Sequence, residues 1–197
     1  MLRGKVDRVD FCDFGDGELK IVVSDYKTGA KKFDIENVRI GLDTQMLLYL
    51  FSIMENGEEY YGKKISPAGI VYVGIKPPVL DISLESEVSP EITKSGLFIS
   101  DIDVLRAMDS ELQGDIIPVK LSDVEKYNET KETKNLISKE ALDELKREIT
   151  DTVLKYAKEL GAGVAYAKPI SHGDDSPCEY CRFHAICRIN RSKGEDK

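Results

Sequence analysis

Residues 21–29 read IVVSDYKTG, and this stretch decides the fold. It opens with three β-branched residues, a run that is typical of a buried strand. Side chains alternate between the two faces of a strand, so Asp25 and Lys27 project to the same side. A carboxylate and an ammonium group therefore lie on one face at the end of a buried strand. Asp25 and Lys27 are the first candidates for catalytic or metal-binding residues.

A second strand precedes this one in the chain. Residues 4–14 carry Val6, Val9 and Phe11, which suits a strand, and residues 15–17, Gly-Asp-Gly, are a turn signal. The two segments predict an antiparallel hairpin. Pairing of its strands would bring Asp7 to the same surface as Asp25.

Asp7, Asp25 and Lys27 together have the groups that phosphodiester hydrolysis needs. Two carboxylates on adjacent strands offer the hard oxygen ligands that Mg²⁺ or Mn²⁺ prefers. A bound cation lowers the pKa of a water and polarises a phosphate, and a lysine beside it can stabilise the developing charge. The competing interpretation is that these are ordinary solvated charges on an exposed sheet. The buried strand before Asp25 and the hairpin before that strand favour a site.

Two other residues of the first strand are expected to be structural. Asp10 has the opposite parity to Asp7, so we expect it in a salt bridge with Arg8 or Lys32. Cys12 is expected to pack as a small apolar group and not to bind metal.

The remaining pattern predicts an α/β domain with a central mixed sheet flanked by helices. Residues 1–190 are expected to form this single domain, and residues 191–197 a disordered tail. The other predicted elements are a helix at 43–55, a strand at 68–75, a loop at 85–95, a short helix at 100–107 capped by Ser100, an edge strand at 116–121, a polar excursion at 126–134 and a helix at 138–160.

Composition limits the possible functions. The net charge of −8 argues against a protein that grips DNA over its whole surface, although it allows a nuclease with carboxylates around a metal. No stretch approaches the roughly 20 apolar residues of a membrane helix. The first residues lack the apolar core of a signal peptide, so we expect a cytoplasmic protein without membrane contact.

Three cysteines near the C-terminal end form a cluster, Cys178, Cys181 and Cys187. In a cytoplasmic chain this clustering favours a metal site over disulfides. Three thiolates need a fourth ligand, which could be His184, His172, Cys12 or a residue outside this chain. A zinc site with three Cys and one His is the plain interpretation.

The chain resembles the PD-(D/E)xK nucleases of the RecB type in three runs, GKVDRVD at 4–10, IVVSDYKTG at 21–29 and QMLLY at 45–49. The resemblance implies a restriction-endonuclease-like core. It also implies that Asp7 and Asp25 bind Mg²⁺ or Mn²⁺ and that Lys27 is catalytic. Gln45 and Tyr49 would contact DNA or support the site, and their spacing of four places them on one helix face.

A closer resemblance covers most of the chain. Residues 177–188, PCEYCRFHAICR, look like the end of AddB-type nuclease domains, and the runs at 67–72, 76–80 and 117–121 agree. This family, AddB or RexB, is the B-type component of the ATP-dependent helicase/deoxyribonuclease. It implies a [4Fe-4S] cluster held by the three cysteines and a fourth ligand outside this chain.

The resemblance implies a working context as well. The family forms a heterodimer with an AddA-type helicase–nuclease partner and processes DNA double-strand breaks for recombinational repair, which suggests an exonuclease. In the family, the nuclease core starts with a helix that carries another metal-site residue. The fourth cysteine ligand of the cluster lies before that helix in the chain. We therefore expect a fragment truncated on its N-terminal side, with an absent or incomplete cluster and ATP dependence only within the full complex.

Two alternatives stay open. The chain could be a degenerate nuclease fold that binds DNA or a partner through a cysteine–metal staple, or it could be a Cas4-like nuclease. The presence of Asp7, Asp25 and Lys27 together favours the enzyme. The long segment between Gly57 and Leu136 favours the AddB type.

Overall fold

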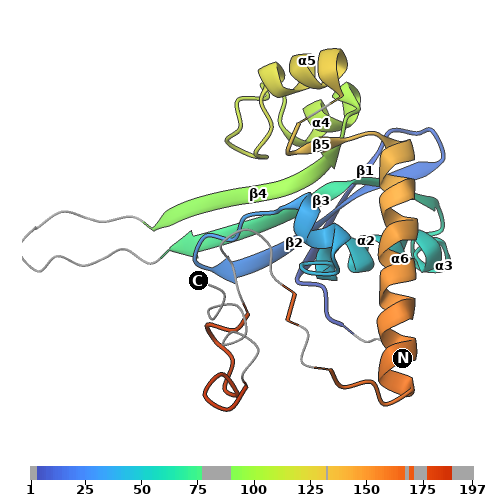
Figure 1. The fold of residues 1–197 in the computed structure, drawn as a ribbon. Coiled ribbons are helices and arrows are strands. Elements are labelled where there is room, and N and C mark those ends of the chain that lie inside the picture. Colours follow the sequence, from blue (N-terminus) through green and yellow to red (C-terminus); the bar gives the residue numbers. More distant parts are fainter. Residues whose placement is uncertain (1–3, 77–89, 132, 167–168, 171–176, 188–197) are drawn as a thin grey trace, which may run out of the picture.

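One mixed sheet of five strands organises the molecule (Figure 1). The computed structural model describes residues 4–76, 90–131, 133–166, 169–170 and 177–187. The strands lie in the order β1-β2-β3-β4-β5, with β1 and β2 antiparallel, β2 and β3 parallel, β3 and β4 antiparallel, and β4 and β5 parallel. The predicted α/β class with a mixed sheet is confirmed. The strands are β1 Arg8–Asp13, β2 Glu18–Thr28, β3 Lys64–Lys76, β4 Glu91–Ile99 and β5 Leu136–Ile137.

The predicted hairpin is formed by β1 and β2. Gly15 and Gly17 adopt positive φ angles of 78° and 87° in its turn, which glycine does without a steric penalty. The first strand begins at Arg8 and not at residue 4, whereas β2 continues to Thr28. This longer second strand keeps Asp25 and Lys27 in regular strand geometry.

Two helices cover one face of the sheet, α2 Gln45–Asn56 and α6 Lys139–Gly161. The apolar stripe of α6 buries Leu142, Leu145 and Ile149, but the exposed fraction of Leu160 is 76%, so the stripe leaves the core before the helix ends. Two shorter helices, α1 Ile35–Arg39 and α3 Glu58–Tyr61, complete this layer. In the described part of the chain, no helix combines the length and apolar character needed to cross a membrane.

A second core fills the opposite face. It lies under α4 Ile102–Met108 and α5 Leu121–Thr130, which Figure 1 shows together beside β5. Strand β3 contributes to both cores because its side chains alternate and because an irregularity in its pairing with β2 at Ala68 changes the parity. Ile70 and Tyr72 belong to the core under α2 and α6, whereas Ala68 and Val71 belong to the second core.

Two predictions for the middle of the chain are wrong. In both segments polar side chains obscure the apolar pattern by which a strand or a helix is recognised. Residues 91–95 were expected in a loop but belong to β4, which pairs with β3 from the Lys76 and Glu91 pair onward. The rest of that predicted loop, residues 85–89, lies outside the described residues. Much of the predicted polar excursion at 126–134 belongs to α5, whose inward face is limited to Val124 and Tyr127.

Two other local predictions also fail. The expected edge strand at 116–121 is irregular, with an isolated bridge between Gln113 and Lys120, because Ile117 and Val119 are buried in the second core without a neighbouring strand. The short helix α4 is capped by Asp101 and not by Ser100. The Asp101 side chain accepts hydrogen bonds from the backbone N–H groups of Asp103 and Val104.

Candidate active site

Asp25 and Lys27 lie on the α2/α6 face of β2, in line with the buried residues that precede them. Asp25 is a buried carboxylate with 7% of its surface exposed. Lys27 Nζ lies 2.6 Å from Asp25 Oδ2, which makes an ion pair. Among the described residues, this oxygen makes no hydrogen bond beyond the ion pair. A buried carboxylate in this state gains from a further cation or donor.

Asp7 reaches the same part of the sheet from one residue before β1. Its Oδ2 accepts a hydrogen bond of 3.1 Å from the backbone N–H of Tyr26, the residue between Asp25 and Lys27. The Asp7 side chain stays exposed. The structure therefore brings Asp7 to the strand that carries the other two candidates, as the hairpin predicts.

Tyr72 of β3 is a neighbour that was predicted only as part of a buried strand. It pairs in register with Asp25 across parallel strands, so both side chains lie on one face. Its exposed fraction is 3%, and Lys27 Nζ lies 5.9 Å from the centre of its ring. Burial, with the nearby negative charges of Asp43 and Asp25, raises the pKa of Tyr72 to about 12. Tyr72 lies two residues after Ile70, so strand alternation places both side chains on the same face, and this spacing could have indicated its position from the sequence.

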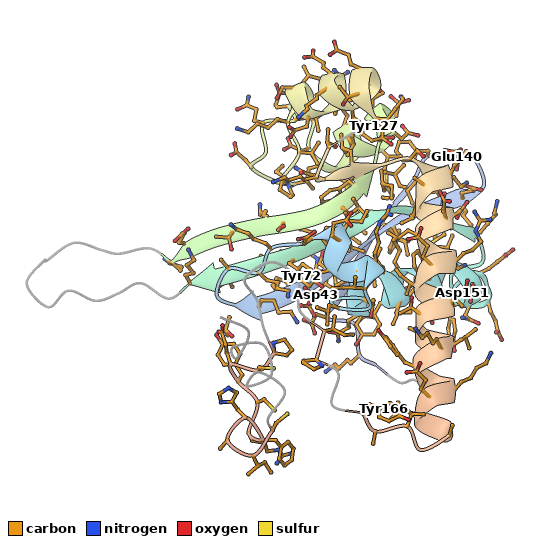
Figure 2. All side chains as sticks on the ribbon, viewed as in Figure 1. Asp43, Tyr72, Tyr127, Glu140, Asp151 and Tyr166 are labelled. Atoms are coloured by element: carbon orange, nitrogen blue, oxygen red, sulfur yellow. The ribbon has the colours of Figure 1, made fainter. Side chains whose placement is uncertain are left out.

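Asp43 approaches this group from the segment before α2, and Figure 2 labels it beside Tyr72. Both carboxylate oxygens of Asp43 lie 2.7 Å from Lys31 Nζ. Asp43 has a positive φ of 53°, which aspartate tolerates better than most residues. The sequence pattern placed it at the start of a helix and gave no sign of this contact.

Gln45 and Tyr49 lie on one face of α2, and Gln45 Nε2 donates a hydrogen bond of 2.8 Å to Tyr49 Oη. Tyr49 packs directly on the segment that leads to Asp7. A side-chain carbon on Gly4 would collide with the Tyr49 ring, so a larger residue at position 4 would displace that ring. The helix thus contacts the chain three residues before Asp7.

The chemistry of Asp7 and Asp25 fits a divalent cation. The buried Asp25 oxygen without a hydrogen-bond partner is the kind of ligand that Mg²⁺ or Mn²⁺ would use. Across the described ranges, no group of three or more His, Cys, Asp or Glu side chains is arranged to hold a metal ion. Mg²⁺ is commonly bound by one or two carboxylates, with water and substrate phosphates completing its shell, so two carboxylates suffice.

The cysteines Cys178, Cys181 and Cys187 lie in successive turns of residues 177–187. The N–H of Cys181 approaches the carbonyl of Cys178 at 3.3 Å, and the N–H of Cys187 donates to Phe183 at 2.8 Å. Within this described segment the sulfur atoms and His184 are not gathered into a metal site. His172, another considered ligand, lies outside the described residues.

The expectation for Asp10 is confirmed and the one for Cys12 is wrong. Arg8 Nη2 lies 2.8 Å from Asp10 Oδ1, which is the predicted salt bridge. Cys12 is exposed and does not pack in a core. It lies on β1, an edge strand, and faces a cavity of about 350 Å³ on the side of the sheet away from Asp25.

Comparison with known proteins gives a consistent match over nearly the whole chain. A family model described as the PD-(D/E)XK nuclease superfamily matches residues 1–188. The chain is 33% identical over 199 residues to the B component of the ATP-dependent helicase/deoxyribonuclease of Clostridium acetobutylicum, covering 96% of this chain and 17% of that protein. It is 30% identical over 207 residues to the protein of the same name from Clostridium perfringens, covering all of this chain and 18% of that protein.

A more distant relative gives the same picture. The chain is 26% identical over 204 residues to a protein of that name from Alkaliphilus oremlandii, again covering 18% of it. The chain thus spans less than a fifth of the length of these relatives.

Proposed function

This chain belongs to the PD-(D/E)XK nuclease superfamily, and on that premise we propose that it is a metal-dependent deoxyribonuclease that hydrolyses phosphodiester bonds in DNA. The observation that carries the proposal is the buried Asp25 carboxylate, which has one oxygen without a hydrogen bond in the described structure and an ammonium group beside it.

In this proposal Asp7 and Asp25 hold a Mg²⁺ or Mn²⁺ ion. When bound, such an ion polarises the phosphate and lowers the pKa of a water. Lys27 is the catalytic cation. Asp25 keeps its ammonium at the site, where it can donate to a phosphate oxygen and stabilise the charge that develops during hydrolysis.

Gln45 and Tyr49 support the site in this proposal and can contact DNA. Their mutual hydrogen bond fixes the orientation of both side chains, and Tyr49 packs against Gly4 beside the Asp7 segment. The Gln45 side chain is exposed and keeps its carbonyl oxygen available for a further contact.

The names of the relatives support a wider role. We propose that residues 1–190 act as one nuclease domain within a helicase–nuclease complex, with an AddA-type partner that supplies unwinding. This complex would degrade DNA ends exonucleolytically and prepare double-strand breaks for recombinational repair in the cytoplasm. ATP would be used by the complex and not by this chain.

The three cysteines are proposed as ligands of a [4Fe-4S] cluster that has a fourth ligand outside this chain. The support is their spacing and the resemblance to the AddB type. Their sulfur atoms do not converge in the described segment, so no step of the reaction is assigned to them. Iron and sulfide analysis after anaerobic purification tests this part, and we expect less than one cluster per chain.

Cleavage of a single-stranded oligonucleotide in Mg²⁺ tests the nuclease proposal. Asp25→Asn and Lys27→Met should each lower the single-turnover rate at least about 100-fold, because each removes a charge from the reacting centre. Asp10→Asn is the matched control on the opposite face of β1, and it should stay within about twofold of the unaltered chain.

Two outcomes would count against the proposal. Near-normal cleavage by Lys27→Met would remove Lys27 from its role. DNA binding without any cleavage that depends on Asp25 would favour the binding-module alternative.

A further inference from the structure

The active-site face of the sheet carries a polar group that the proposed mechanism does not use, the hydroxyl of Tyr72. We propose that Tyr72 is a further substrate-contacting residue, whose hydroxyl donates a hydrogen bond to a phosphate oxygen of the bound DNA strand. The proposal deepens the nuclease function and rests on it.

The position of Tyr72 is the first argument. Tyr72 and Asp25 are paired residues of adjacent parallel strands, and their side chains lie on the same face. Lys27, two residues further along β2, holds its ammonium 5.9 Å from the centre of the Tyr72 ring. A phosphate that Lys27 contacts would therefore lie close to the Tyr72 side chain.

The second argument is the accessibility of the hydroxyl. Tyr72 as a whole is 3% exposed, but in the described residues its hydroxyl is not one of the fully buried side-chain atoms without a hydrogen-bond partner, which are Asp25 Oδ2 and Asp109 Oδ2. In the described part of the chain, neither Asp25 nor Asp43 accepts a hydrogen bond from it, although both lie near enough for their charges to act on it. The donor is therefore available to a ligand.

The charges near the hydroxyl are compatible with an anionic ligand. Each nearby carboxylate already has a lysine at ion-pair distance, Asp25 with Lys27 at 2.6 Å and Asp43 with Lys31 at 2.7 Å. The negative charges of the two carboxylates are thus balanced, and the Lys27 ammonium lies beside the Tyr72 ring. Phosphate oxygens of a nucleic-acid backbone accept hydrogen bonds from tyrosine as well as from lysine.

Tyr72→Phe tests the proposal because it keeps the ring, its packing and its contact with Lys27 and removes only the hydroxyl. The matched control is Tyr127→Phe. Tyr127 is also buried, at 5%, and also has a lysine ammonium near its ring, at 5.4 Å, but it lies in the second core at α5 (Figure 2).

Two measurements use the whole chain. Fluorescence anisotropy with a 12-nucleotide single-stranded DNA in Ca²⁺ measures affinity, and single-turnover cleavage in Mg²⁺ measures the rate. We expect Tyr72→Phe to lower the affinity at least about 10-fold, the loss of one hydrogen bond to a charged group, and Tyr127→Phe to change it less than about twofold. The loss of affinity in Tyr72→Phe should be equal for oligo-dT and oligo-dA, because a phosphate contact does not depend on the base.

The outcomes separate this inference from the function on which it rests. Affinity and rate within about twofold of the unaltered chain for Tyr72→Phe would overturn the inference and leave Tyr72 a packing residue. A deficit that differs between dT and dA would overturn the phosphate contact. Absence of cleavage by the unaltered chain, or cleavage insensitive to both Asp25→Asn and Lys27→Met, would overturn the nuclease function of this site, while the affinity of Tyr72→Phe would still decide whether the hydroxyl contacts DNA.

Discussion

At the scale of single residues, metal binding should depend on Asp25. Its carboxylate is buried, and in the described structure its Oδ2 has the Lys27 ammonium beside it but no hydrogen bond, so this oxygen can still serve as a ligand of a divalent cation. Calorimetric titration with Mn²⁺ should give binding that disappears in Asp25→Ala and persists in Lys27→Ala, since the lysine is not a ligand. Unchanged Mn²⁺ binding by Asp25→Ala would place the metal elsewhere.

Protonation of Glu18 should account for part of the loss of folding stability at low pH. Glu18 starts β2 and pairs in register with Lys64 of β3, and hydrogen bonds from Lys64 and then Lys20 lower its pKa from 4.5 to about 2. A lowered carboxyl pKa stabilises the folded state fully above the unfolded value. That stabilisation is lost as pH falls from about 4.5 through 2.

Urea unfolding of Glu18→Gln beside the unaltered chain measures this contribution. The difference in unfolding free energy should be about 1 kcal/mol at pH 7, because these ion pairs are near the surface. It should shrink at pH 3 and be nearly gone at pH 2. A difference that does not vary with pH would mean that packing, and not charge, is responsible.

The sequence identifies some residues of the candidate site, and it does not identify others. Asp7, Asp25 and Lys27 could be placed together because strand alternation and a hairpin are local rules. Asp43 could not, because its contact with Lys31 depends on a positive φ angle and on how the segment before α2 folds back. Tyr72 was hidden differently, since a tyrosine in a buried strand usually has only a packing role.

At the scale of elements, apolar periodicity predicts what is well buried and fails where burial is partial. The helices α2 and α6 were predicted within about two residues of their ends, the usual uncertainty of helix boundaries. Strand β4 was not predicted, because Thr93, Lys94 and Ser95 are polar and only half-buried. The helix α5 was missed because an inward face of two residues makes little pattern.

The contact between β3 and β4 gives a prediction about glycine. A methyl group on Gly96 would collide with the carbonyl oxygen of Ile70 and lie 3.0 Å from Val71 Cα, both of them backbone atoms of β3. Gly96→Ala should therefore destabilise the fold by about 2 kcal/mol in urea unfolding, since the strands must separate.

Gly161→Ala is the matched control for this substitution. Gly161 ends α6 and has open space around its Cα, so alanine there should be neutral or stabilise by up to about 1 kcal/mol. Equal effects of the two substitutions would show that the β3–β4 contact does not require glycine.

At the scale of the whole molecule, one sheet joins two cores. Strand β3 supplies Ile70 and Tyr72 to one core and Ala68 and Val71 to the other, so neither core can open without disturbing the central strand. The proposed site lies at the strand that pairs with β3, on the face covered by α2 and α6. Rigid positioning of catalytic groups favours such a place in the sheet over a loop.

The cysteine segment contrasts with this centre. Its residues, 177–187, are all exposed or half-buried, and Figure 1 draws them apart from the sheet. We expect a chain with Cys178, Cys181 and Cys187 all changed to serine to melt within about 2 °C of the unaltered chain, because surface substitutions rarely exceed about 0.5 kcal/mol. Cleavage that depends on Lys27 should also persist in this variant.

Leu47→Ala is the reference variant in the same melting experiment, because it shows how far a core substitution lowers the melting temperature. Leu47 is 1% exposed in the core under α2, so its truncation should cost about 3 kcal/mol and lower the melting temperature by about 6–12 °C. A loss of similar size in the triple serine variant, before any iron is added, would mean that the cysteine segment stabilises the folded domain directly. A small loss would instead mean that the folded domain does not depend on the cysteine side chains for its stability.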